Sequence, residues 1–243
     1  RYASRGLGDV YKRQVLEPAL FGLWNLLRVL LGYLHFADFG VNTGVLYQKP
    51  KYNGRGETDK AQNVSQQGFS FILYFSFIIS IILIMLSFIP LTFFIDNKYI
   101  ILLIALSIFV FSLTNFLSVE ARVEHKFAQL GIFLIISSIS SLLLTIISVN
   151  YFKENLVEII ALSWIAGLGV GLIFLYFLFP FQIFNRLDIG TIKKLFVIGF
   201  PISLVPILMI LFRTIDRWIL ADLVSLELLG YYAFGATIGF FLY

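Results

Sequence analysis

The chain has 243 residues, of which 59% are hydrophobic and 13% are charged, whereas about a quarter of the residues in soluble domains are charged. With a mean hydropathy of +0.92, this composition excludes a water-soluble fold and predicts an integral membrane protein. The net charge of +4 does not point to nucleic acid, because the basic residues gather between the apolar runs. The chain has no cysteine and only two histidines, so we expect no metal site and no cofactor.

The first segment, residues 1–14, is polar and basic and lacks the apolar core of a signal peptide, so we interpret it as a non-native or garbled segment. Seven apolar runs follow, and about 20 residues at 1.5 Å per residue cross a bilayer as a helix. They lie near residues 16–47, 68–95, 99–119, 129–149, 156–179, 195–217 and 229–243. We therefore predict an all-α polytopic membrane protein with six complete transmembrane helices and the start of a seventh, which stops unfinished at Tyr243.

Lysine and arginine alternate between rich and poor linkers along the chain. The rich linkers are 47–67, 120–128 and 180–194, and each poor turn between them carries one lysine. Because cytoplasmic loops carry the excess of Lys and Arg, this pattern places the rich linkers in the cytoplasm. We expect a multi-pass membrane protein whose first complete helix runs inward. If the N-terminus is cytoplasmic, at least one helix is then expected before Leu16.

A weak internal repeat relates the start of the chain to its end. Aligning Gly22 with Gly230 gives an offset of 208 residues, which spans six helices, as an internal duplication requires. The matched pairs are Leu16 with Val224, Leu20 with Leu228, Phe21 with Leu229, and Trp24 with Tyr232. Extended upstream, the repeat also predicts a helix before Leu16, so we expect the chain to be truncated at both ends.

The first apolar run carries a polar stripe. At about 100° per residue its members share one face of a helix, and they are Asn25, Arg28, His35, Asp38 and Asn42. In lipid such a face must point at protein or at a water-filled cavity. One interpretation is a cavity wall with Arg28 as an anion contact and His35 or Asp38 as a proton or cation site. The other is that these side chains pair with neighbouring helices or reach the interface.

A second charged group follows the apolar stretch 202–212 without a turn signal. Arg213, Asp216 and Arg217 fall on one helical face, although a charge at mid-bilayer costs roughly 2.5–3.5 kcal/mol. Asp216 can neutralise one arginine, which leaves the other for a ligand or for another residue. A guanidinium binds phosphate oxygens bidentately and stays protonated when buried. Contact with an anionic substrate and simple structural pairing both remain open.

Three further patterns are interpreted as structural. Glu120, Arg122, Glu124 and Lys126 form a mixed-charge helix end, which is usually a solvated rim. Residues 53–56 form a turn without the spacing of a phosphate-binding loop. Gly167, Gly169 and Gly171 lie inside an apolar helix, where small residues allow close helix packing.

A combination of small and aromatic residues resembles the polysaccharide-synthesis or oligosaccharide flippase family of the O-antigen exporter type, within the MOP superfamily that also holds the multidrug (MATE) exporters. The residues concerned are Gly199, Phe200 and Pro201, then Asp216, Arg217 and Trp218, then Leu229, Gly230, Tyr231 and Tyr232. The resemblance implies two six-helix bundles that face each other across a cationic cavity. Residues 15–190 would be the N-terminal bundle without its first helix, and residues 191–243 the start of the second bundle.

The function implied by the resemblance is transport by alternating access of an undecaprenyl-pyrophosphate-linked oligosaccharide across the cytoplasmic membrane, for cell-surface polysaccharide. The expected partners are this lipid-linked oligosaccharide, the lipid bilayer and, as a further candidate, the polysaccharide polymerase machinery. Candidate substrate-binding residues are Asn25, Arg28, Asn42, Arg213 and Arg217. Candidate ion-coupling residues are His35, Asp38 and Asp216.

Two other functions stay open. A multidrug antiporter with cationic substrates would favour unpaired carboxylates, whereas these helices carry an excess of arginine. A membrane glycosyltransferase or polymerase would need a long outward loop or a catalytic constellation. The expected outward turns near 96–98 and 150–155 are short, and no paired-carboxylate or Ser/His/Asp set offers itself. We therefore expect that the protein is not an enzyme.

Overall fold

The computed structural model describes residues 16–33, 38–88, 98–152, 155–179 and 187–242. Within these ranges the chain forms eight helices: α2 (Pro18–Tyr33), α3 (Val41–Asn53), α4 (Thr58–Leu86), α6 (Lys98–Val123), α7 (Phe127–Tyr151), α8 (Leu156–Leu178), α9 (Ile189–Leu223) and α10 (Leu226–Leu242). Five of them, α4 and α6 to α9, are long and apolar enough to cross a membrane. The all-helical, membrane-spanning prediction is confirmed at this level.

The helix expected over residues 16–47 is instead two helices. α2 ends at Tyr33, and α3 begins at Val41 after a turn at residues 38–40. Phe39 and Gly40 have positive φ angles of 49° and 84°, a left-handed conformation that stops a right-handed helix. The polar stripe drawn over residues 25–42 therefore does not lie on one helical face, because its two ends belong to separate helices.

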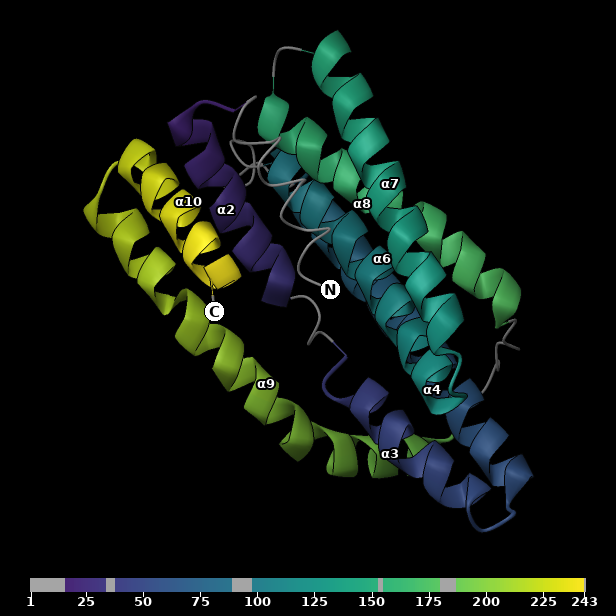
Figure 1. Ribbon diagram of the computed structural model, residues 1–243. Coiled ribbons are helices and arrows are strands. Elements are labelled where there is room, and N and C mark those ends of the chain that lie inside the picture. Colours follow the sequence, from purple (N-terminus) through teal and green to yellow (C-terminus); the bar gives the residue numbers. More distant parts are fainter. Residues whose placement is uncertain (1–15, 34–37, 89–97, 153–154, 180–186, 243) are drawn as a thin grey trace.

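The helices form a bundle with a curved helix alongside it (Figure 1). α4, α6, α7 and α8 pack together, α3 covers α4 and α6, and α2 lies beside α10, while α9 runs from α3 toward α10. One apolar core joins α3, α4 and α6 to α7, α8 and the start of α9. A second joins α2, α6, α8 and α10. α6 and α8 contribute to both cores and thus connect the two halves of the bundle.

The start of α4, the α6–α7 turn and the start of α9 lie at one end, called here the α3–α4 end (Figure 1). Gln67 of α4 accepts a hydrogen bond of 2.9 Å from the backbone N–H of Asp188, and Lys126 lies 4.3 Å from the Phe179 ring centroid. The lysine-rich linkers were predicted to share one side, and their described parts do. Residues 47–67 are not a loop, however, because only residues 54–57 separate α3 from α4. The turn expected near residues 53–56 is confirmed, with Gly56 at φ 73°.

α9 is longer than the predicted run 195–217. It begins after Asp188, whose carboxylate accepts hydrogen bonds from the Thr191 hydroxyl and from the Gly190 and Thr191 N–H groups. These bonds, first that of Thr191, hold the pKa of Asp188 below its usual value. Pro201 and Pro206 lie inside the helix, and each lacks the N–H of a regular helical bond. α9 curves along its length (Figure 1).

Glycines mark the closest helix contacts. A Cβ on Gly199 would overlap the carbonyl oxygen of Gly40, and a Cβ on Gly44 would overlap that of Leu195, so α3 and α9 approach backbone to backbone. The prediction of close packing at the α8 glycines is confirmed for Gly167 and Gly171, which pack against α7. Nothing lies within 4 Å of a Cβ at Gly169.

The α2–α10 contact is reciprocal. A Cβ on Gly22 would overlap the carbonyl oxygen of Leu226 and lie 3.1 Å from the Gly230 nitrogen. A Cβ on Gly230 would overlap the carbonyl oxygen of Pro18 and lie 3.3 Å from the Gly22 nitrogen. Pro18 and Leu226 are separated by the same 208 residues as Gly22 and Gly230. The two members of the predicted repeat thus present the same surface to each other, as in a two-fold contact.

Candidate functional site

The first candidate site lies on the last third of α9. Arg213 is exposed, whereas Asp216 and Arg217 are half-buried. The helix continues through all three residues, so the predicted helical face exists. The Asp216 carboxylate accepts a hydrogen bond from the Tyr232 hydroxyl of α10 and another of 2.9 Å from the Arg217 backbone N–H. One carboxylate therefore ties α9 to α10.

The neighbouring contacts bring in the end of α2. The Tyr33 hydroxyl lies 2.6 Å from the Thr214 hydroxyl and accepts a hydrogen bond of 3.1 Å from the Trp218 indole N–H. Together with Asp216 and Tyr232 these residues form a polar and aromatic set, called here the α9 network. Sequence analysis missed Tyr33 and Thr214, because a contact across 181 residues leaves no local signal. Aromatic rings and hydroxyl groups beside arginines suit a ligand that carries both sugar and phosphate.

α2 reaches this network through Tyr33 and not through the predicted Asn25. Asn25 is 2% exposed, and its amide donates 2.9 Å to the Phe21 carbonyl one turn earlier, which is a structural bond within α2. Arg28 is half-buried. His35 lies outside the described residues. The ion-coupling role predicted for His35 stays a prediction.

Asp38 and Asn42 lie at the start of α3. The Asp38 carboxylate accepts bonds from the backbone N–H groups of Gly40 at 3.3 Å and Asn42 at 3.0 Å, so it caps the helix. The Asn42 side chain is 3% exposed. Within the described part of the chain neither its Nδ2 nor its Oδ1 has a hydrogen-bond partner. A buried amide of this kind is a candidate contact for water or for a polar ligand.

The second candidate site lies at the α3–α4 end and corrects the sequence analysis. Glu120 was assigned to a solvated rim, but it is 0% exposed, and the ammonium of Lys49, itself 8% exposed, bonds its Oε2. The Ser65 hydroxyl donates 2.5 Å to its Oε1. The rim interpretation failed because it treated the end of α6 alone, whereas α3 and α4 close over it. The spacing of Glu120 and Glu124 by one helical turn was the available signal.

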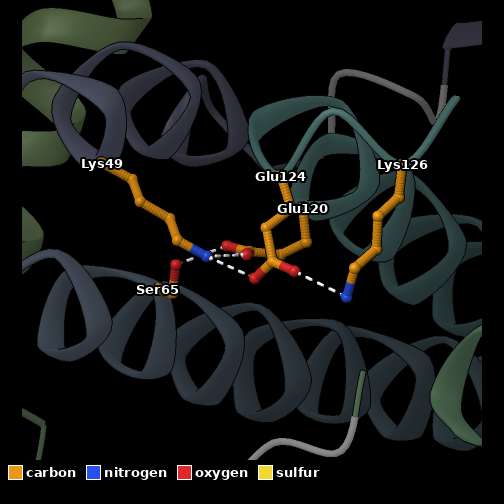
Figure 2. Close-up of polar contacts among 5 residues, drawn as sticks. All are labelled: Lys49, Ser65, Glu120, Glu124 and Lys126. Atoms are coloured by element: carbon orange, nitrogen blue, oxygen red, sulfur yellow. Dashed lines mark hydrogen bonds and ion pairs between the residues drawn. The ribbon is translucent and has the colours of Figure 1, made fainter. Parts of the chain in front are cut away.

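Figure 2 shows the whole group, called here the charge cluster: Lys49, Ser65, Glu120, Glu124 and Lys126. Lys49 also donates 3.1 Å to Glu124, which accepts 2.8 Å from Lys126. Burial raises the pKa of Glu124, but the bonds from Lys126 and Lys49 outweigh this and leave that pKa below its usual value. Two lysines and two glutamates make the cluster neutral when all are ionised.

A cavity of about 500 Å³ opens beside the charge cluster. Its polar lining includes Lys49, Ser65, Glu124 and Lys126, together with the side chains of Gln62 and Gln66. Glu120 is not part of the lining, yet both side chains that bond it are. In the described ranges no three His, Asp or Glu side chains group as metal ligands.

Comparison with known proteins gives one finding. A model of the family described as polysaccharide biosynthesis protein matches residues 14–243, nearly the whole chain. Neither the curated proteins nor the solved structures contain a match.

Proposed function

Because the chain belongs to the polysaccharide biosynthesis protein family, we propose that it is a non-enzymatic flippase of the bacterial cytoplasmic membrane. It moves an undecaprenyl-pyrophosphate-linked oligosaccharide from the inner to the outer leaflet by alternating access. The product feeds the synthesis of a cell-surface polysaccharide such as O-antigen or capsule. Its partners are this lipid-linked substrate, the surrounding bilayer and the polymerase machinery that receives the glycan.

The observation that carries the proposal is the pair of arginines beside the α9 network. Arginines are rare in a membrane-length apolar helix and mark functional positions there, and Arg213 and Arg217 are one turn apart on α9. In the proposal they hold the pyrophosphate, together with Arg28 of α2, while Trp218 and Tyr232 stack on sugar rings. Asn42 fits a hydrogen bond to the glycan better than Asn25, whose amide already bonds the Phe21 carbonyl.

The reciprocal glycine contact supports the two-bundle arrangement of such a transporter. If residues 15–190 belong to one bundle and residues 191–243 open the next, α2 and α10 are equivalent helices. Equivalent helices meet through identical surfaces at a two-fold axis, and Gly22 and Gly230 meet in this way. We propose that the five apolar spans and the α2–α3 pair make six transmembrane passes, with α10 beginning a seventh. Asp38, His35 and Asp216 stay the proposed ion-coupling residues.

A cation antiporter of the multidrug type is less well supported. Such a site needs carboxylates that are available to a cationic drug, whereas Asp216 bonds Tyr232 and Glu120 bonds Lys49 and Ser65. A glycosyltransferase or polymerase needs carboxylates that reach its substrate, and Glu120 is fully buried. Both alternatives are outcomes of the following test.

The first test is made in cells that lack the gene. Lipid-linked oligosaccharide should accumulate in the inner leaflet and be released by the wild-type gene, but not by Arg217→Ala expressed at an equal level. Lys60→Ala is the matched control, because Lys60 forms an exposed pair with Glu57. Normal crossing without the gene would contradict the proposal and favour an antiporter. Failure to assemble the oligosaccharide would favour an enzyme.

A second test addresses alternating access. The hydroxyls of Thr43 on α3 and Ser203 on α9 lie 3.1 Å apart, and the chain has no cysteine, so Thr43→Cys with Ser203→Cys can form a single disulfide. Oxidation should stop transport and a reductant should restore it, while each single variant stays active in both conditions. Undiminished transport by the fully cross-linked protein would show that α3 and α9 do not separate.

A further inference from the structure

We propose that Glu120 is a proton-binding site, loaded from the cavity at the α3–α4 end, and that its protonation leaves Lys49 to the partly exposed Glu124 and so weakens the attachment of α3 to the first bundle. This inference rests on the proposed transport function, because it assigns the step that α3 takes in the transport cycle. It concerns a different place from His35, Asp38 and Asp216. Four features of the charge cluster support it.

The first feature is a buried ion pair that the stability of the fold does not require. Glu120 is 0% exposed and Lys49 8% exposed, and well-packed apolar side chains of similar volume generally stabilise such a place as well as an ion pair does. A buried pair is best attested where it sets a register or works as a switch. Here it joins three helices: Lys49 comes from α3, Ser65 from α4 and Glu120 from α6 (Figure 2).

The second feature is a route for the proton. Ser65 and Lys49 line the cavity of about 500 Å³ and each donates to one oxygen of Glu120. Glu120 is therefore one hydrogen bond behind the cavity wall. Water in the cavity can reach the Ser65 hydroxyl, which can pass a proton to Oε1. Besides Lys49, the titratable groups of the cavity lining are Glu124 and Lys126, both members of the charge cluster, whereas Asn53, Thr58, Gln62 and Gln66 do not titrate.

The third feature is a second place for the lysine. The Lys49 ammonium already donates 3.1 Å to Glu124, which lies at the α6–α7 turn and lines the cavity. When Glu120 takes a proton from hydronium, its carboxylate becomes a neutral carboxylic acid and water is left. Lys49 keeps its own proton and its bond to Glu124. The cluster then changes from neutral to a charge of +1, carried by Lys49 and Lys126 against Glu124.

The charged groups that face Glu120 are known for each helix around it. α3 contributes Lys49, and the α6–α7 turn contributes Glu124 and Lys126. α4 contributes Ser65, and the end of α8 contributes Leu178 and Phe179 to the cavity wall. Protonation of Glu120 thus removes the negative charge that Lys49 contacts most closely.

The fourth feature is the contact between α3 and α9. Gly40, Thr43 and Gly44 of α3 meet Gly199, Ser203 and Leu195 of α9. The two helices touch here backbone to backbone, so a displacement of α3 must change this contact. Lys49 lies one to two turns further along α3 from these contacts. Breaking the ion pair between Glu120 and Lys49 therefore acts on α3, the helix that contacts α9 of the proposed second bundle.

The first experiment detects the proton itself in the purified protein. Infrared difference spectra between neutral and acid pH should show the C=O stretch of a buried carboxylic acid. Glu120→Gln should lose this band, Glu124→Gln should keep it, and Ser65→Ala should keep it at a shifted frequency, because the hydroxyl bonds the carboxyl group. A wild-type spectrum without a buried carboxylic acid band, or a Glu120→Gln spectrum in which the carboxylic acid bands are the same as in wild type, would overturn the inference.

The second experiment follows α3. Spin labels on Lys51→Cys and Lys193→Cys, both exposed positions, report the α3–α9 distance in a chain without other cysteines. Acid pH should shift the distance distribution, and Glu120→Gln should show the shifted distribution already at neutral pH. The Glu57→Gln control, in the exposed pair with Lys60, should respond like wild type. An unchanged distance in wild type at the pH where the band appears would overturn the coupling to α3.

These readouts separate the two proposals. The infrared band and the label distance need no transport substrate, so they stand if the flippase assay fails. If wild type transports the oligosaccharide and Glu120→Gln transports equally with the same pH dependence, the flippase proposal stands and the inference fails.

Discussion

The charge cluster and the α9 network both place ionised side chains on apolar helices, but the two regions differ in how deeply these side chains are buried and in which groups they bond. In the charge cluster Glu120 is 0% exposed, and Lys49 neutralises its charge in an ion pair. On α9, Arg213 is exposed and the Asp216 carboxylate bonds a tyrosine of α10. The contrast teaches that a fully buried carboxylate is neutralised by a lysine of another helix, whereas the half-buried Asp216 joins two helices through a tyrosine and leaves the neighbouring Arg213 in contact with the surroundings.

The largest expected effect is on stability, at the charge cluster. Lys49→Met leaves Glu120 buried without its cation, which should cost about 3–5 kcal/mol in the free energy of unfolding. Equilibrium unfolding of the purified protein in detergent measures it. The double variant Lys49→Met with Glu120→Leu should regain most of the loss, since an apolar replacement of a buried pair is often neutral. If Lys49→Met alone were as stable as wild type, the ion pair of Lys49 and Glu120 would make no contribution to stability.

The next largest effect is expected for Arg217→Gln, which should weaken substrate binding and leave the free energy of unfolding nearly unchanged. Arg217→Gln removes a charged hydrogen-bond donor, worth about 1.5–3 kcal/mol to a bound anion, or roughly a 10- to 150-fold loss in substrate affinity. Binding of a short-chain pyrophosphate-linked glycan to the purified protein measures it, with thermal unfolding as the companion. Unfolding should change by less than about 1 kcal/mol. A large loss of stability with normal binding would place Arg217 with the structural charges.

A smaller effect concerns Glu124 and pH. Its pKa is below the usual 4.5, because bonds from Lys126 and Lys49 outweigh the burial that raises it. A lowered carboxyl pKa stabilises the fold fully above about pH 4.5 and progressively less as the pH falls below that value. Thermal unfolding followed from neutral to acid pH should therefore show a decline that is reduced in Glu124→Gln. At neutral pH the partly exposed ion pair of Glu124 and Lys126 should contribute about 0.5–1 kcal/mol to the free energy of unfolding.

The smallest effect is expected at the exposed pair of Lys60 and Glu57, whose charged atoms lie 3.0 Å apart. Lys60→Met should change the free energy of unfolding by less than about 0.5 kcal/mol, because water and salt screen an exposed pair. Raising the salt concentration should change wild type and variant equally. An effect as large as that of Lys49→Met would mean that burial does not distinguish the two pairs.

The helices were largely predictable from the sequence, because a run of apolar residues of membrane length has few alternatives. The runs near 99–119, 129–149 and 156–179 lie within α6, α7 and α8. The break at residues 38–40 was missed because Phe39 carries no turn signal. Phe39 and Gly40 have φ angles of 49° and 84°, and Gly40 meets Gly199 of α9. A non-glycine residue rarely adopts a positive φ, so the pattern of residues gave no reason to expect it at Phe39.

The candidate sites were predictable in part. Arg213, Asp216 and Arg217 stood out because the surrounding sequence is apolar, and that contrast is local information. Glu120 stood among other charges, so its burial depended on which helices cover it, and the partners Lys49 and Ser65 are 71 and 55 residues away. The Gly22–Gly230 alignment rested on few identities, yet the two residues are in contact.

The distance along the chain between α2 and α10 also has a consequence for biosynthesis. The glycine face of α2 receives its partner only after 208 more residues have been made, which takes about 10–40 s at 5–20 residues per second. In the proposed topology α2 is part of a transmembrane pass, so its glycine face would meet lipid during this interval. Asn25 is already satisfied, because its amide bonds the Phe21 carbonyl within the same helix. Before α10 is made, the amide of Asn25 in α2 is therefore already hydrogen-bonded, and its Nδ2 is not left as an unsatisfied donor.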